Sequence, residues 1–318
     1  MRIVIAADGS GDFTSLQAAV DAVPEGAEGA ELFLRSGVYR ERVVIHRGGV
    51  HLVGEDRDRT VIAASGCAKD PDENGLERGT FLSATLLVSG SHVTVENLTV
   101  RNDAGDGRIV GQAVAVYAAG DRGLWRNVNM IANQDTLYCG PLNPKVAKFI
   151  SPRRGSAELA DVDNLGNCPL TESVQRFENC FIRGDVDFIF GSYRCLFDRC
   201  TLYMNERGGY YTASNSAEGQ PWGMVFRRCV LTGECAEGKA WLGRPWRRFA
   251  RTVFLNCDMD GHVAPQGFSD WDEERVITDL YGEYGTTGVR ADLSERDPRE
   301  KRLSPQEAQE FESLFDRY

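Results

Sequence analysis

Four short segments of this 318-residue chain combine polar side chains with strand-like surroundings in a way that core packing does not explain. Carboxylate, carboxamide and guanidinium groups are the types that serve acid–base, nucleophilic and charge-stabilising chemistry. Each segment alone is a weak signal, because an aspartate at a strand end is usually a cap or turn residue. The segments are Gly111-Gln112-Ala113-Val114-Ala115, Asn133-Gln134-Asp135-Thr136-Leu137-Tyr138, Gly184-Asp185-Val186-Asp187-Phe188-Ile189-Phe190-Gly191 and Trp241-Leu242-Gly243-Arg244-Pro245-Trp246.

Other common catalytic arrangements are poorly supported. The chain has four histidines, none of which falls in one of these motifs, and it has no Gly-x-Ser-x-Gly, so a serine triad lacks its nucleophile elbow. Neither a Cys-x-x-Cys pair nor a His-Glu-x-x-His spacing occurs. We therefore expect no metal and no cofactor.

Together the four segments resemble the pectin methylesterase (pectinesterase) family, carbohydrate esterases built on a right-handed parallel β-helix. The family's Gln-Ala-Val-Ala, Gln-Asp-Thr-Leu-Tyr, Val-Asp-Phe-Ile-Phe-Gly and Leu-Gly-Arg-Pro-Trp motifs stand here unaltered and in family order. The resemblance extends over nearly the whole chain through weaker echoes, which are Gly9-Ser10-Gly11-Asp12-Phe13, Tyr211-Thr212-Ala213, Ala264-Pro265-Gln266-Gly267-Phe268 and Tyr281-Gly282-Glu283-Tyr284.

The resemblance implies a role for each matching polar residue. Asp187 would be the nucleophile and Asp135 the general acid and then base, with Gln112 and Gln134 as oxyanion donors and Arg244 orienting Asp187. For the substrate cleft the resemblance favours three aromatic residues and leaves Trp241 and Phe188 open; the three are Tyr138, Phe190 and Trp246.

These residue types suit the hydrolysis of a methyl ester. A carboxylate can attack an ester carbonyl, but methoxide is a poor leaving group and must receive a proton, so Asp135 must begin protonated. Two neighbouring carboxyls push their titrations apart, and Arg244 beside Asp187 fixes which of them stays ionised. The implied function is a pectinesterase that hydrolyses the C6 methyl ester of galacturonate units in pectin or oligogalacturonides and releases methanol.

A recurring block predicts the elements that must position these residues. Each copy reads polar, polar, small apolar, any, apolar, and the irregular steps between copies suit solenoid coils that carry variable loops. We therefore expect one all-β parallel β-helix domain over residues 1–318. The blocks begin at Glu96, Arg126, Glu178, Asp198, Arg228 and Asn256.

Four of the nine cysteines share the small apolar position of that block. We expect these residues to form an inward stack of reduced thiols that act as small hydrophobic groups, with redox chemistry or metal binding as the rival reading. The odd cysteine count also favours free thiols in a reducing compartment over a disulfide framework. The four are Cys180, Cys200, Cys229 and Cys257.

Two helices are expected at the ends of the solenoid. Apolar spacing over residues 14–23, with Thr14 and Gln17 as a capping box and Pro24 as a stop, predicts an N-terminal capping helix. Ser304, Pro305 and Glu307 mark the start of a C-terminal amphipathic helix packed on the solenoid wall.

Composition limits the partners and the location. A net charge of −11 argues against nucleic acid and anionic membranes, so a polyanionic substrate must meet locally placed arginines. No segment is apolar enough to cross a bilayer, and the first residues do not resemble a signal peptide, so a cytoplasmic location is expected although the family is commonly exported. The sequence does not indicate an oligomeric state.

The chain departs from the family's pattern in an insertion at about 139–176, between the segments that carry the two aspartates. Our hypothesis is that this insertion borders the cleft and supplies positive charge for galacturonate carboxylates, and a solvated surface loop is the alternative. Its basic residues are Lys145, Lys148, Arg153 and Arg154.

Two other functions remain open at this point. One is an esterase on the same scaffold that acts on another sugar ester, because the fold itself does not choose the reaction. The other is a non-catalytic β-helix that binds acidic glycans. The presence of Asp135, Asp187 and Arg244 argues against a non-catalytic protein. Methanol release would distinguish a pectinesterase from an esterase that acts on another sugar ester.

Overall fold

The computed structural model describes residues 1–318 except 25, 28, 73, 142–172 and 279. The chain divides into two compact units, Met1–Ala160 and Asp161–Tyr318. The basic residues of the expected insertion lie outside the described residues. The single-domain organisation therefore stays a prediction.

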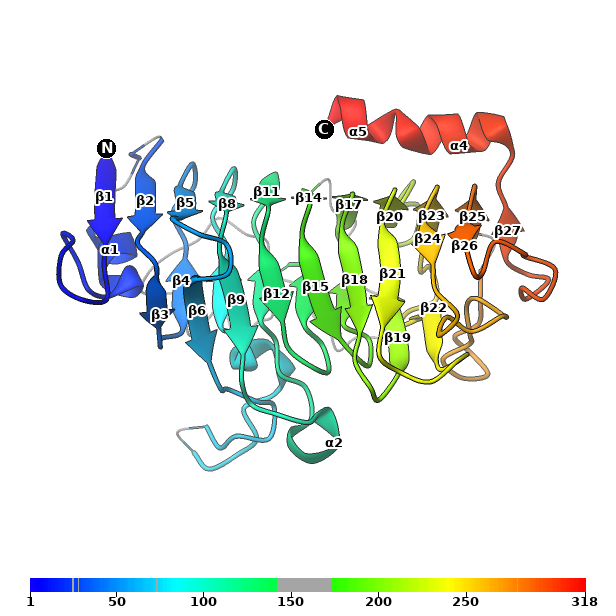
Figure 1. Ribbon diagram of the computed structural model, residues 1–318, viewed down its shortest axis with the longest axis horizontal. Coiled ribbons are helices and arrows are strands. Elements are labelled where there is room, and N and C mark those ends of the chain that lie inside the picture. Colours follow the sequence, from blue (N-terminus) through cyan, green and yellow to red (C-terminus); the bar gives the residue numbers. More distant parts are fainter. Residues whose placement is uncertain (25, 28, 73, 142–172, 279) are drawn as a thin grey trace. The chain divides into compact units, whose positions relative to one another are not determined.

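In the first unit, strands pair in parallel with the strand one coil further along the chain, which builds three ladders (Figure 1). The first ladder comprises β1 (Arg2–Ile5), β2 (Glu31–Leu34), β5 (His51–Gly54), β8 (Thr94–Glu96) and β11 (Gly123–Arg126). The second comprises β3 (Gly37–Tyr39), β6 (Thr60–Ala64), β9 (Thr99–Asn102) and β12 (Asn129–Ile131). The third comprises β4 (Val43–Ile45), β7 (Leu86–Val88), β10 (Val116–Ala118) and β13 (Leu137–Cys139).

The second unit repeats this arrangement. Its first ladder comprises β14 (Val174–Glu178), β17 (Arg194–Asp198), β20 (Met224–Arg227), β23 (Thr252–Leu255), β25 (Tyr281–Tyr284) and β27 (Lys301–Arg302). Its second comprises β15 (Phe181–Gly184), β18 (Thr201–Met204), β21 (Val230–Gly233), β24 (Asp258–Met259) and β26 (Thr287–Gly288), and its third β16 (Ile189–Gly191), β19 (Gly209–Ser214) and β22 (Ala240–Pro245). The predicted parallel β-helix is confirmed.

The recurring block forms the corner between the first and second strands of six coils. The polar residue directly before the small apolar position of every block has a positive φ, between 51° and 58°, which lets the chain turn sharply. The next residue points inward and is at most 1% exposed. The left-handed residues are Asn97, Asn127, Asn179, Arg199, Arg228 and Asn256.

The predicted inward stack of thiols is confirmed. All four block cysteines are free and buried, and the Sγ atoms of Cys200, Cys229 and Cys257 each lie 3.6 Å from a backbone oxygen of the preceding coil. The rings of four phenylalanine residues stack beside these thiols, with centroids 4.3 to 4.6 Å apart, and we call this stack the phenylalanine ladder. Its members are Phe177, Phe197, Phe226 and Phe254.

Both terminal helices are present, with one correction. Helix α1 (Leu16–Ala22) is capped by Ser15, whose side chain accepts from the Ala18 N–H, so the predicted capping box on Thr14 is wrong. The carboxylate of Glu41 selects this start, because it accepts from the Ser15 hydroxyl and the Leu16 N–H. The short helices η1 (Thr80–Ser83) and α2 (Gly107–Val110) also belong to the first unit.

The C-terminal helix begins as predicted, with the Ser304–Glu307 capping box and Pro305 in the first turn of α4 (Pro305–Glu312). It continues into α5 (Leu314–Arg317), and the two pack on residues of β14, β17, β20 and β23. Among the described residues no helix is both long and apolar enough to span a membrane.

A buried ionic cluster supports the loop that follows β24. Arg296 donates to Glu283 at 2.5 Å, and its Nε lies 4.0 Å from Glu300. The guanidinium also donates to the carbonyl of Pro265, and the neighbouring Gly267 carbonyl accepts from Leu242 of β22. This cluster therefore fixes a loop that pairs with the strand carrying Arg244.

The two carboxyls of the cluster titrate differently. Burial and the neighbouring Glu283 raise the pKa of Glu300 to about 10. Burial opposes ionisation of Glu283, but hydrogen bonds from Glu300 and Arg296 hold its pKa below the usual value. Glu300 is therefore protonated in the folded protein at neutral pH and Glu283 is ionised.

We expect Glu300→Gln to change how stability depends on pH. The stability that protonated Glu300 contributes is fully present below its unfolded pKa, near 4.5, and is lost as pH rises toward about 10. Glutamine has no such proton to lose, so the melting temperature of the variant relative to the wild type should rise steadily from pH 5 to pH 9. Thermal unfolding with the exposed Glu310→Gln as control measures this, and a difference that does not vary with pH would contradict it.

Candidate active site

The two candidate aspartates occupy equivalent places in their own coils. Asp135 lies two residues before β13 and Asp187 two residues before β16, at the entry to a third-ladder strand. Their φ angles are 65° and 52°, and their exposed fractions are 8% and 6%. The same left-handed φ occurs at the solenoid corners, and aspartate tolerates it, so the costly feature of these two residues is a buried carboxyl, which needs partners when it is ionised.

In the first unit, the polar residues around Asp135 come from adjacent coils. Gln112 follows Gly111, which ends α2 with a φ of 75°, and the N–H of Ala113 donates to the carbonyl of Gln134 at 3.1 Å. Both glutamine side chains are partly exposed. The coil register therefore places Gln112 and Gln134 on neighbouring rungs, with Asp135 next in the chain.

Tyr138 lies deeper than a cleft residue normally does. It is fully buried and packs edge-on against Tyr117 and Phe81, with ring centroids 4.7 and 4.9 Å away. Its predicted role in substrate binding stays a prediction.

In the second unit, the structure brings Asp187 and Arg244 together. Arg244, in β22, donates from Nε to Oδ1 at 2.9 Å and from Nη2 to Oδ2 at 2.7 Å. This two-point contact fixes both oxygens of the carboxylate. The side chain of Asp187 is only 9% exposed and that of Arg244 19%. The carboxylate is thereby held in one orientation.

Opposing effects set the ionisation of Asp187. Burial is the largest and raises its pKa, the hydrogen bonds and charge of Arg244 lower it, and the charge of Asp185 raises it. The net pKa lies above the usual value. Without Arg244, burial and Asp185 would favour the protonated acid, which is not a nucleophile.

The structure places the other aromatic residues considered for the cleft in different surroundings. Phe190 packs edge-on against the partly exposed Trp246, with centroids 5.8 Å apart, so two of the predicted cleft residues touch each other. Phe188 is fully buried against Tyr211 and is a core residue. Trp241 pairs with Tyr210 in the β19–β22 register.

Sequence reasoning missed two residues at this site, Tyr210 and Trp271. The Cζ atom of Arg244 lies 3.9 Å from the centroid of each ring. Tyr210 immediately precedes the Tyr211-Thr212-Ala213 echo. Trp271 is a lone aromatic residue between acidic residues, a pattern that should have indicated a surface role.

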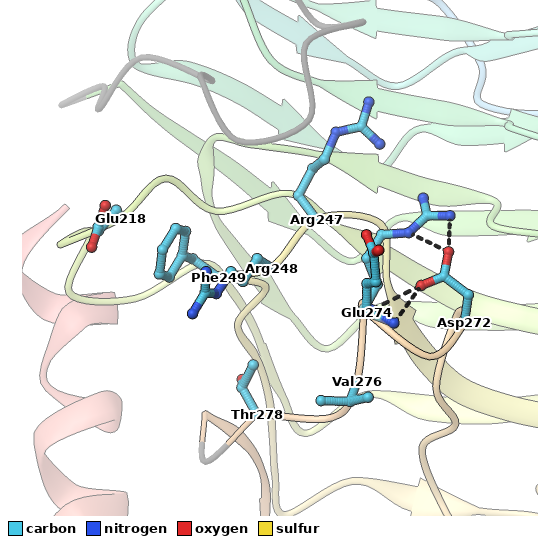
Figure 2. A pocket seen from close by; sticks show the side chains of 9 residues that line it. Glu218, Arg247, Arg248, Phe249, Asp272, Glu274, Val276 and Thr278 are labelled. Atoms are coloured by element: carbon cyan, nitrogen blue, oxygen red, sulfur yellow. Dashed lines mark hydrogen bonds and ion pairs between the residues drawn. The ribbon is translucent and has the colours of Figure 1, made fainter.

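A pocket of about 790 Å³ in the second unit is lined in part by Arg275, which contacts Trp271. The Cζ atom of Arg275 is 4.8 Å from the centroid of Trp271. Figure 2 shows Glu218 and Asp272 on opposite sides of the pocket. Its lining is mixed in charge and comprises Glu218, Arg247, Arg248, Phe249, Asp272, Glu274, Arg275, Val276 and Thr278.

Among the described residues, no group of three or more histidine, cysteine, aspartate or glutamate side chains is arranged to hold a metal ion.

We expect Arg244→Met to destabilise the protein by about 3 kcal/mol at pH 8, because it leaves a buried carboxylate without its counter-charge. The cost should be smaller at pH 5, since Asp187 then escapes by taking up a proton. Adding Asp187→Asn should restore part of the loss. Urea unfolding of the single and double variants at both pH values measures this, and a cost that neither pH nor Asp187→Asn alters would contradict it.

Comparison with known proteins identifies the family. The Pectinesterase family model matches residues 2–142 and 170–314, which leaves 143–169 outside the match, within the insertion expected from the sequence. Pectinesterase 31 of Arabidopsis thaliana is 30% identical over 315 residues, which cover 96% of this chain and 89% of that protein.

Solved structures of pectin methylesterases are also similar to this chain. A pectin methylesterase from carrot superimposes with a TM-score of 0.78 at 28% identity, covering 95% of this chain and 88% of that one. A pectin methylesterase in complex with a hexasaccharide superimposes with a TM-score of 0.77 at 26% identity, covering 97% and 94%. This chain belongs to the pectinesterase family, whose members are carboxylic ester hydrolases.

Proposed function

We propose that this enzyme hydrolyses the C6 methyl ester of galacturonate units in pectin or oligogalacturonides and releases methanol. The observation that carries the proposal is the buried Asp187 carboxylate, fixed at both oxygens by Arg244 within a family motif. A carboxylate held in one orientation, with a cation that opposes the effect of burial on its pKa, is suited to nucleophilic attack.

In the proposed reaction, an oxygen of Asp187 attacks the ester carbonyl and forms a tetrahedral oxyanion. The side-chain amides of Gln112 and Gln134 donate to this oxygen, and one such donor is typically worth about 3 to 4 kcal/mol. The bond to the methoxy oxygen then breaks while Asp135 transfers its proton to it, so methanol leaves and an acyl anhydride with Asp187 remains.

Hydrolysis of that intermediate returns the enzyme to its starting state. Asp135, now ionised, takes a proton from water, and the resulting hydroxide attacks the acyl carbon. The bond to Asp187 breaks, the product forms as the carboxylic acid and becomes galacturonate by losing its proton to solvent, and Asp187 regains its charge beside Arg244. Each carboxyl therefore returns to its initial protonation state.

A carbohydrate substrate is consistent with the solved relatives, two of which are complexes with hexasaccharides. Galacturonate units carry carboxylates, which a chain of net charge −11 would repel without local positive charge. Arg247, Arg248 and Arg275 of the pocket beside Trp271 supply such charge, although acidic side chains share its lining. The cytoplasmic location and the role of the insertion stay predictions.

Replacing the nucleophile should abolish turnover. We expect Asp187→Ala to lower methanol release from methyl-esterified oligogalacturonide by at least about a thousandfold, because no second group can form the acyl intermediate. The exposed Asp316→Asn serves as the control and should retain the wild-type rate. Equal rates for Asp187→Ala and the wild type would remove the mechanism.

The same assay separates the rival functions. A wild type that releases acetate from acetylated oligosaccharides but no methanol would be an esterase of another specificity. One that binds unesterified oligogalacturonide and releases neither product would be a non-catalytic glycan-binding protein.

The proposed acid role of Asp135 leads to a different prediction, because its first task is to protonate the leaving group. Asp135→Asn should be strongly impaired on methyl esters and less impaired on trifluoroethyl esters, whose alkoxide leaves without full protonation. The comparison uses the first turnover of alcohol release for both esters, before hydrolysis of the common acyl intermediate, with Asp187→Ala as the reference. A loss of the same size on both esters in this first turnover would exclude the acid role.

A further inference from the structure

The guanidinium of Arg244 is enclosed by two aromatic rings. Its Cζ atom lies 3.9 Å from the centroid of Tyr210, in β19, and 3.9 Å from that of Trp271, in the loop after Phe268. These distances place both rings within the range of cation–π attraction, which strengthens as a site is shielded from water. The Arg244 side chain is 19% exposed.

The two kinds of contact use different parts of the same group. Nε and Nη2, on one edge of the guanidinium, donate to Asp187 at 2.9 and 2.7 Å. The aromatic rings contact it through their π-systems and take none of these donors. Arginine suits such a site because its planar group stacks and donates at the same time, which an ammonium group does not.

Each ring is itself held in place. The Tyr210 N–H donates to the carbonyl of Asp185 at 3.0 Å, and the Tyr210 carbonyl accepts from Phe188 at 3.3 Å, so its backbone brackets the corner that carries Asp187. On the other side, the Trp271 N–H donates to the carbonyl of Arg275 at 2.9 Å.

Arg275 completes the support of Trp271. Its guanidinium lies 4.8 Å from the Trp271 ring centroid and is fixed by Asp272, which accepts from Nε at 2.8 Å. The side chain of Arg275 is 22% exposed, so this outer pair is partly shielded as well.

We propose that Tyr210 and Trp271 are positioning residues that clamp Arg244 against Asp187 and so preserve the ionised nucleophile. The proposal rests on the proposed function of Asp187. If the guanidinium rotated away, the buried carboxylate would keep the repulsion of Asp185, and Arg244 is the cation that acts on it among the described residues of its unit.

Among the described residues of its unit, two other titratable groups act on Asp187 or respond to its charge. Asp185 is 2% exposed and lies 3.6 Å from Arg207, and the buried hydroxyl of Tyr281, from β25, is influenced by the charge of Asp187. Neither Asp185 nor Tyr281 can replace the attraction of Arg244. Loss of the clamp should therefore favour the protonated form of Asp187.

The test compares Tyr210→Leu with Tyr210→Phe, which keeps the ring. The acid limb of the pH profile of kcat/KM for methanol release should move to higher pH by about 0.5 to 1 pH unit in Tyr210→Leu and stay in place in Tyr210→Phe. Activity of Tyr210→Leu should approach the wild-type value above the limb. An unmoved limb, or an equal loss at every pH, would overturn the clamp.

A second readout does not depend on catalysis. In protein labelled with [15N]arginine, the Arg244 Nε–H resonance, identified by its absence in Arg244→Lys, should be displaced by ring currents in the wild type and in Tyr210→Phe. It should move toward the ordinary arginine position in Tyr210→Leu. A wild type that releases no methanol would defeat the proposed function, whereas an Arg244 resonance indifferent to Tyr210→Leu would defeat the clamp.

Discussion

A left-handed residue at the corner between the first and second strands, present in six coils, is a constraint that both units share. The corner residues have φ angles of 51° to 58°, and the side chain that follows each of them points into the core. An extended residue at this point would carry the next strand away from its neighbour and turn its inward side chains outward. Asp135 and Asp187 use the same local geometry at the entry to third-ladder strands, so the device that folds the solenoid also presents the candidate catalytic groups.

The sequence predicted the solenoid because its corners repeat side-chain types. Asparagine tolerates the left-handed region, and the small apolar residue after it must fit inside the coil, so both positions are visible without a structure. The phenylalanine ladder was equally visible and was overlooked, since Phe177, Phe197, Phe226 and Phe254 each lie three residues before a block cysteine. The start of α1 was misplaced because Glu41, distant in the chain, chooses Ser15 over Thr14.

The candidate site was predictable where a short motif contains the whole feature. Asp187 and Arg244 were paired on the strength of two motifs, and their contact is present. Tyr210 and Trp271 were not found, because their relation to Arg244 depends on how a strand and a loop stack beside β22. No fixed spacing in the chain encodes that relation. An aromatic residue type alone does not distinguish a site residue from a core residue, because many aromatic residues of this chain lie in the core.

The like-on-like ladders have a consequence for how such proteins diversify. A coil whose inward side chains match those of its two neighbours places no demand on the length of the connections between its strands. The family match stops at residue 142 and resumes at 170, yet the phenylalanine and cysteine ladders after that point are regular. Evolution can therefore exchange the connections that border a substrate path without redesigning the interior, and one scaffold can serve polymers of different length and decoration.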